Sequence, residues 1–101
     1  MKITRIWHGI TTADHADEYL QFVEETGLKD YKRIKGNLSV KLLKRIENDI
    51  CHLLTVTEWD SYESIRSFAG DNYQKAKYYT GDEKFLLEME DNVAHYETYE
   101  Y

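Results

Sequence analysis

Two histidines and a tryptophan are the side chains of this sequence best suited to chemistry: His8, His95 and Trp59. An imidazole can accept or donate a proton near neutral pH, and an indole offers one N–H donor and a flat apolar wall. Together they could supply the base, the hydrogen-bond donor and the aromatic wall of a catalytic site. The alternative is structural, with histidines that pack and bond to the backbone and a tryptophan that anchors a strand-to-helix turn.

Other aromatic side chains could line a pocket for an apolar ligand. Trp7 directly precedes His8, and the chain is rich in tyrosines, of which Tyr62, Tyr78 and Tyr79 are the candidates for ligand contact. A tyrosine stripe more often packs with its hydroxyl at the rim of the core. Whether these residues contact a ligand or pack in the core therefore depends on the helices and strands that carry them.

The hydrophobic pattern predicts the element order βαββαβ. Residues 2–10 alternate as a strand, 11–27 have helical spacing that ends at Gly27, and 38–46 and 51–59 read as a hairpin that turns at Asn48 and Asp49. Asp60 is the expected N-cap of a second helix that stops at Gly70. We expect a short further helix over 71–81, a turn within 82–89 and a last strand over 92–101.

That order is the split βαβ, or ferredoxin-like, arrangement of an α+β fold, with an antiparallel sheet in the order 4-1-3-2 and both helices on one face. The first strand lies between the third and the fourth, and we expect it to run parallel to the third and antiparallel to the fourth. In that arrangement His8, Trp59 and His95 would meet at one end of the sheet. A register error of one residue would move any of them to the other face.

Composition limits the classes of function. A chain of 101 residues with net charge −6 is the length of one domain, residues 1–101, and its charge argues against nucleic acid as a partner. No apolar run is long enough to cross a membrane and no signal peptide is evident, so we expect a cytoplasmic protein without a membrane partner. The single Cys51 cannot form an intrachain disulfide, and the acids beside His15 are explained by the helix dipole, so we expect no metal site.

Several segments together resemble one known family. "ITRIWHG", the helix that ends in "EETG", "TEWDSYESIRSFAG" and the closing "VAHYETY" are similar to the antibiotic biosynthesis monooxygenase family of dimeric α+β barrels, over nearly the whole chain. The resemblance implies a cofactor-independent monooxygenase that acts on an aromatic or apolar small molecule, with no cofactor, and it places the family's tryptophan at Trp59. The asparagine that the family carries upstream on that strand is missing from "HLLTVTEW".

Two other functions remain open within that resemblance. The haem-degrading branch uses a histidine on the helix after the third strand and an asparagine on the first strand, and this sequence has neither. Haem degradation therefore ranks below the monooxygenase function. In a haem-binding protein of this sequence, Tyr78 or Tyr79 would supply the oxygen ligand of the iron. The second alternative is a non-catalytic module that binds a small ligand or serves in dimeric interactions. A deep pocket beside His8, Trp59 and His95 would favour the enzyme, and side chains filling that space would favour the module.

The charge distribution predicts a homodimer. Residues 29–45 carry seven basic residues against Asp30, and residues 82–101 carry seven acidic residues against Lys84. The second and fourth strands are both sheet edges, and the strands have apolar residues on both faces, so one face needs a cover. A two-fold axis would let each edge meet its complement and bury that face, with Tyr99 and Tyr101 extending the contact.

Overall fold

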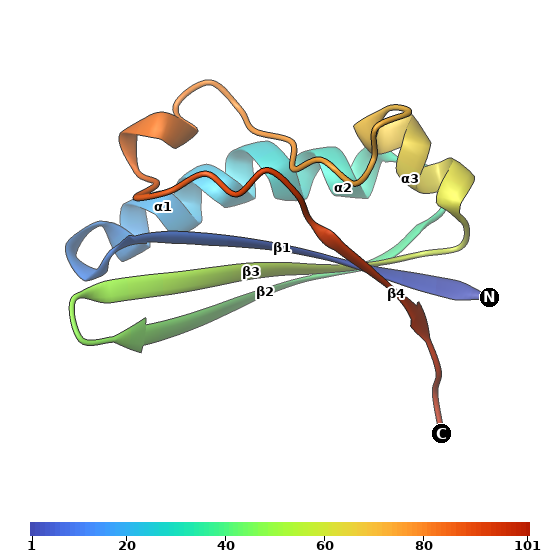
Figure 1. Cartoon of the computed structure of the whole chain (residues 1–101), viewed down its shortest axis with the longest axis horizontal. Helices are drawn as coiled ribbons and strands as arrows, with labels where there is room; N and C mark the ends of the chain where they lie inside the picture. Colours follow the sequence, from blue (N-terminus) through green and yellow to red (C-terminus); the bar gives the residue numbers. More distant parts are fainter.

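The computed structural model describes all residues, 1–101, as one four-stranded sheet with its helices on a single side (Figure 1). The elements follow the order β1 (Lys2–Thr12), η1 (Ala13–His15), α1 (Ala16–Val23), η2 (Glu24–Leu28), α2 (Lys29–Arg33), β2 (Asn37–Glu47), β3 (Ile50–Trp59), α3 (Tyr62–Ala69), η3 (Asp82–Lys84) and β4 (Ala94–Thr98). This is the predicted ferredoxin-like α+β fold. No helix combines the length and the apolar character needed to span a membrane.

The sheet order is β2-β3-β1-β4, as predicted, but every neighbouring pair is antiparallel. The expected parallel pairing of β1 with β3 is wrong, because Ile3 lies opposite Trp59 and Thr12 lies opposite Ile50. The reason is topological. The helical crossover makes β2 parallel to β1, and the tight turn at Asn48, whose φ is 56°, reverses the chain so that β3 enters between them running the opposite way.

The two faces of the sheet have different surroundings. Along β1 every second residue, starting at Ile3, is buried against the helices, while the residues between them are partly exposed on the other, open face. β3 alternates in the same way from Cys51 to Trp59. In Figure 1 the helices lie on one side of the sheet and the C-terminus extends away from the other. The side chain of each strand residue therefore faces either a packed interior or an uncovered surface.

The first helical region is longer than predicted. It does not stop at Gly27 but passes through a π-helical turn, η2, into α2, and the chain turns only at Gly36, where φ is 99°. Gly27 is buried within the helical region, and the next turn buries Tyr31 against the sheet. The apolar stripe thus continues past the glycine, and packing of that stripe outweighs the low helix propensity of glycine.

The second helical region is shorter than predicted. Ser61, not Asp60, caps α3 by accepting a hydrogen bond from the Ser64 backbone N–H, and the predicted stop at Gly70 is confirmed by its φ of 84°. The predicted helix over 71–81 is absent. The backbone of that segment bonds instead to the chain before β4, from the Ala76 N–H to Asp91 and from the Val93 N–H to Gln74. These bonds occupy groups that a helix would need.

Two aromatic clusters form the core between sheet and helices. One is built from Trp7, Ala16, Tyr19, Val23, Cys51 and Leu53, and the other from Ile3, Tyr31, Trp59, Ile65 and Phe68. Both belong to the helix-covered face. The open face carries no comparable buried cluster.

Candidate functional site

The three predicted catalytic residues do not meet. His8 pairs with Leu54 and lies on the open face, Trp59 pairs with Ile3 at the opposite end of β1 on the helix side, and His95 pairs with Arg5. The expected convergence depended on parallel pairing of β1 and β3. Because the two strands are antiparallel, the end of β3 lies beside the start of β1.

Trp59 is a structural anchor in this fold. Its side chain is fully buried, its indole N–H donates to Thr57 Oγ1 at 2.8 Å, and its ring packs against Tyr31 and Phe68 with centroid distances of 6.3 and 5.9 Å. No polar group of Trp59 is left to face a ligand. The packing role considered for it from the sequence agrees with these contacts.

His95 belongs to a cluster around a buried arginine that the sequence did not single out. Arg5 is only 2% exposed and donates to the Tyr73 carbonyl at 2.5 Å and to His95 Nε2 at 3.0 Å, with Lys75 O at 3.5 Å. Burial, and then the nearby guanidinium, lowers the pKa of His95 to about 4. His95 is therefore a neutral acceptor. Tyr62 packs on its ring, 6.2 Å away, and not on a cavity.

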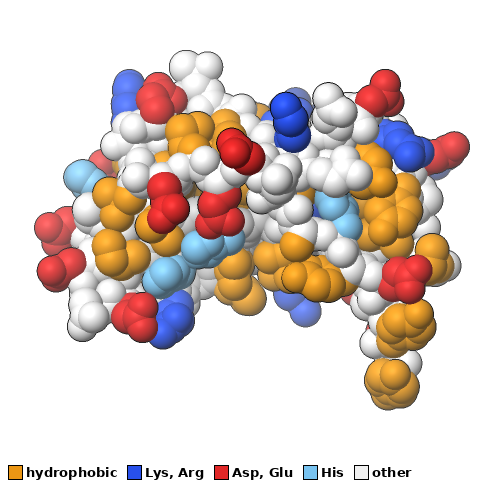
Figure 2. Space-filling view, in the orientation of Figure 1, with side chains coloured by type: hydrophobic (Ala, Val, Ile, Leu, Met, Phe, Trp, Pro, Cys, Tyr) orange, Lys and Arg blue, Asp and Glu red, His pale blue; other side chains and the backbone are white.

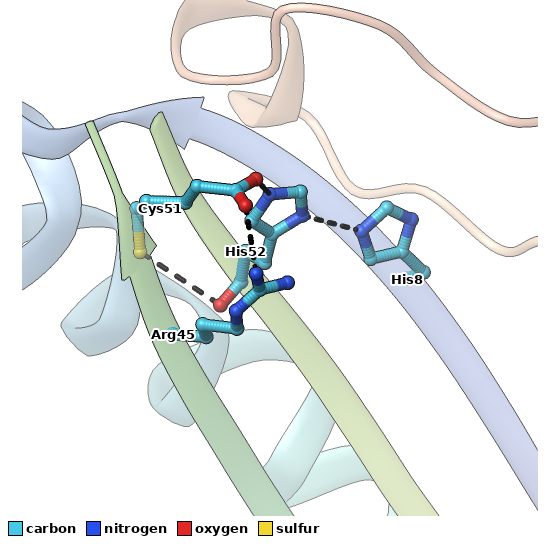
Figure 3. A network of polar contacts seen from close by, with 5 residues as sticks. His8, Arg45, Cys51 and His52 are labelled. Carbon is cyan, nitrogen blue, oxygen red and sulfur yellow. Dashed lines mark hydrogen bonds and ion pairs between the residues drawn. The ribbon is translucent and has the colours of Figure 1, made fainter. Parts of the chain in front are cut away.

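His8 forms part of a polar network on the open face (Figure 3). Its Nδ1 lies 2.5 Å from Glu90 Oε2 and its Nε2 lies 3.1 Å from His52 Nδ1, while His52 Nε2 lies 3.6 Å from Glu47. Arg45 binds Glu47 at 2.7 Å. The first two contacts need one N–H from each ring: His8 Nδ1–H donates to Glu90, and His52 Nδ1–H donates to His8 Nε2. Figure 2 shows histidines side by side at the edge of the molecule, flanked by acidic and basic side chains.

A hollow of about 450 Å³ on the open face is lined by His8, Leu43, Lys44, Arg45, His52 and Leu54. A second cavity, half open to solvent, lies between the sheet and the helical region that contains η2. Its volume is about 20 Å³, enough for one water molecule. Two predicted ligand-contact residues, Trp7 and Tyr79, line it. The complete lining is Trp7, Tyr19, Val23, Thr26, Gly27, Tyr31, Thr55, Lys77, Tyr79 and Asp82. Tyr78, also predicted to contact a ligand, does not line the cavity: it packs edge-on against Trp7 and donates its hydroxyl hydrogen to the Glu90 carbonyl.

Polar groups of both charges reach this cavity. Asp82, 4% exposed, accepts the Tyr19 hydroxyl at 2.8 Å and the Tyr79 backbone N–H at 2.6 Å. Burial, reinforced by Asp82, raises the pKa of Tyr19, so its phenol stays protonated. Lys77 supplies a cation at the wall, and the buried indole N–H of Trp7 has no hydrogen-bond partner. The residues that line the cavity thus combine aromatic rings with a carboxylate and an ammonium group.

The other residues of the cavity escaped the sequence analysis. Tyr19 and Tyr31 follow the helical apolar stripe, which marks them as core but not as lining of a cavity. Asp82 and Lys77 lie in the connection after α3, and no periodic pattern assigns such a segment to a face. Only the folded chain brings them under the helices. No group of three or more His, Cys, Asp or Glu side chains is arranged to hold a metal ion.

Comparison with solved structures identifies the fold. The chain is similar to SnoaB from Streptomyces nogalater, described as a cofactor-independent oxygenase, with a TM-score of 0.67 and 12% identity over 99% of this chain and 95% of SnoaB. It is similar to Rv0793 from Mycobacterium tuberculosis, with a TM-score of 0.66 and 12% identity over 100% and 98% of the two chains.

A third similar structure, from Bacillus cereus, is provisionally described as an antibiotic biosynthesis monooxygenase. Its TM-score is 0.65, with 8% identity over 99% of this chain and 97% of that one. No family model matches the sequence, and no curated protein sequence matches it. The resemblance seen in the sequence is therefore confirmed as a shared fold with antibiotic biosynthesis monooxygenase structures.

Proposed function

We propose that this chain binds a small aromatic molecule in the helix-side cavity and oxidises it with molecular oxygen without a cofactor. The observation that carries the proposal is the cavity itself, where Trp7, Tyr19, Tyr31 and Tyr79 surround an ammonium group and a carboxylate. Ligand sites typically combine apolar walls with a few placed polar groups. The fold shared with SnoaB, a cofactor-independent oxygenase, supports the same reaction class.

The chemistry needs a substrate that becomes an electron-rich anion. A phenol or anthrone that loses a proton becomes an anion that can reduce dioxygen. When dioxygen converts a ring CH₂ group of the substrate into a carbonyl, one oxygen atom becomes the carbonyl oxygen. The other oxygen atom leaves as water with the two hydrogens of the CH₂ group. Lys77 at the cavity wall would stabilise the phenolate. Asp82 holds Tyr19 and the Tyr79 backbone in place and thereby shapes the cavity.

Oxygen consumption tests this function. We expect oxygen uptake above the uncatalysed rate with at least one member of a panel of naphthols and anthrones, and Lys77→Met should lower it at least about tenfold. Glu63→Gln, on the exposed surface of α3, is the matched control and should leave it unchanged. Uptake equal to background across the panel would remove the oxygenase proposal.

His8 and His95 remain sequence-based candidates for acid–base groups, and variants separate them from the cavity. If His8→Ala and His95→Ala lower turnover at least about tenfold while Lys77→Met does not, the reaction takes place outside the cavity. We expect the reverse, because neither histidine lines the cavity.

We further propose that two copies associate through the open face of the sheet. Ile6, Leu54 and Val56 lie half-buried on that face, and Leu43 and Tyr96 are exposed. The two edges, β2 and β4, are basic and acidic as the sequence indicated, and direct pairing of opposite edges needs a second molecule. Sedimentation should give a dimer at micromolar concentration, and Leu43→Asp should shift it to monomer, whereas Lys32→Asp on the helix side should not.

A non-catalytic ligand-binding module is the second candidate, favoured by the small cavity. With room for about one water molecule, the interior admits an aromatic ring only if a side chain moves. Ligand-dependent stabilisation without oxygen uptake would identify this function.

A further inference from the structure

Tyr79, one of the three tyrosines that line the helix-side cavity, is itself a phenol that contacts a carboxylate and a cation. The Tyr79 hydroxyl donates to Asp30 Oδ2 at 2.6 Å, and Lys77 Nζ lies 5.6 Å from the centre of the Tyr79 ring. Lys77 Nζ also lies 3.7 Å from the same Asp30 oxygen. One phenolic group thus meets a proton acceptor at its hydroxyl and an ammonium group near its ring.

The Asp30 carboxylate is built into the end of the helical region. It lies in the first turn of α2, and Arg33 Nη1 reaches its other oxygen at 3.7 Å, so the group is held from two sides. Burial, and then the hydrogen bond to Asp30, raises the pKa of Tyr79, so its hydroxyl remains a donor. An ionised carboxylate that accepts a phenolic hydrogen makes a charge-assisted bond, which is stronger than a neutral one.

The Tyr79 backbone is fixed independently of its ring. Its N–H donates to Asp82 Oδ2 at 2.6 Å and its carbonyl accepts from the Asp82 N–H at 3.0 Å. The side chain has one hydrogen bond, to Asp30, and lies in a segment without regular secondary structure. A change of side-chain rotamer can therefore move the ring while the backbone stays in place.

Gly27 shows where the space would open. A Cβ built on Gly27 would lie 3.8 Å from both the Tyr79 and the Tyr31 rings, so the glycine sits directly over the part of the cavity that Tyr79 closes. The cavity holds about one water molecule with Tyr79 in place. Withdrawal of the phenol would leave a space of about that phenol's own size, bounded by Gly27, Tyr31 and Lys77.

We propose that Asp30 and Lys77 form the binding site for the phenolic hydroxyl of a ligand, and that Tyr79 occupies this site in the ligand-free protein. This rests on the proposed function of the cavity and deepens it, because it assigns the phenolic hydroxyl to named side chains and gives Tyr79 the role of an internal competitor. A ligand of this class replaces the Tyr79 phenol group for group, with its hydroxyl on Asp30 and its ring beside Lys77. An aromatic without a hydroxyl leaves Asp30 without its donor and binds more weakly.

The test compares two probes of the same shape, 1-naphthol and naphthalene, by NMR titration of the full chain. Tyr79→Ala should bind 1-naphthol at least about tenfold more tightly than the unmodified protein, because the competing phenol is gone, and should prefer it to naphthalene at least about tenfold. Tyr101→Ala, which removes an exposed tyrosine at the C-terminus, is the matched control and should match the unmodified protein. Asp30→Ala in the Tyr79→Ala background should reduce the preference to less than about threefold.

The outcomes separate this inference from the function on which it rests. Equal binding of both probes by Tyr79→Ala, or no gain over the unmodified protein, would overturn the inference and leave the cavity as a ligand site. Binding of neither probe by any variant would overturn both. If Tyr79→Ala does not fold, Tyr79→Phe decides: it keeps the ring, releases the Asp30 bond, and should bind 1-naphthol more tightly than the unmodified protein does.

Discussion

The two faces of the sheet differ in the partners that their basic side chains contact. On the helix side, Arg5 is buried and its hydrogen-bond partners are neutral: two backbone carbonyls and an uncharged His95. On the open face, His8 and His52 bond to each other and each faces a carboxylate, from Glu90 and Glu47 respectively. Alternation along β1 alone places Arg5 and His8 on these two faces.

The difference indicates what each face is suited for. The helix side encloses aromatic rings, a cavity and polar groups held in fixed positions, which are the features of a ligand site. The open face is partly solvated and combines apolar side chains with a balanced set of charges, which suits contact with another protein surface.

Core truncation should separate the faces most strongly. Trp59→Ala, on the helix side, removes a fully buried ring that packs on Tyr31 and Phe68, and should lower the free energy of unfolding by about 3–5 kcal/mol. Leu43→Ala, on the exposed surface of β2, should cost less than about 1 kcal/mol in the monomer. Urea denaturation at low protein concentration measures both, and equal losses would contradict the assignment of the core to one face.

Loss of a buried carboxylate should have the next largest effect. Asp82→Ala leaves the Tyr19 hydroxyl and the Tyr79 N–H without their acceptor, and should cost about 1–3 kcal/mol of unfolding free energy. The matched control is Glu88→Ala at an exposed position six residues on, which should stay within about 0.5 kcal/mol. If the two variants melt at the same temperature, Asp82 does not hold the cavity wall.

Acid should destabilise the helix side through His95. The folded-state pKa of about 4 lies below the ordinary histidine value, so between these two pH values the unfolded chain binds the extra proton and stability falls as pH decreases. The contribution is present above about pH 6.5 and is lost as the pH falls toward about 4. Because the His95 ring is only partly buried, solvent screening limits this contribution to about 1–2 kcal/mol.

Denaturation curves between pH 7 and pH 4 measure this contribution. His95→Gln should flatten the pH dependence of unfolding free energy over that range, and His15→Gln, at an exposed position, should not. An unchanged slope in His95→Gln would place the acid-sensitive group elsewhere.

The open-face network should contribute least. Glu90→Gln weakens the contact with His8, but both side chains are partly solvated, at 33% and 41% exposure, so the cost should stay below about 1 kcal/mol. Thermal melts of Glu90→Gln and of the unmodified protein should differ by only a few degrees. A loss comparable to that of Asp82→Ala would mean that the open face is held as firmly as the interior.

Periodicity and turn residues predict the order of the elements along the chain and, through it, the order of the strands in the sheet. Alternation in 2–10 and 51–59, the turn at Asn48 and the stop at Gly70 gave the element order and the sheet order correctly. Strand direction was wrong between β1 and β3, since alternation is the same for parallel and antiparallel neighbours. That error also brought His8, Trp59 and His95 together at one end of the sheet.

The cavity could be predicted only in part. Trp7 and Tyr79 were singled out as aromatic residues, whereas Lys77 and Asp82 were not, because the connection after α3 has no period that assigns its residues to a face. A helix was expected there, and its absence follows from backbone bonds to the chain before β4, which no local pattern encodes.

We propose that ligands bind on the helix side of the sheet and not on the open face. Intermolecular NOEs between 1-naphthol and the full chain distinguish the two sites. We predict contacts from the naphthol ring to Gly27, Tyr31 and Trp7, together with displacement of the Tyr79 ring signals. Contacts to Leu43, Leu54 and His52 instead, at saturating 1-naphthol, would place the site on the open face and contradict the account.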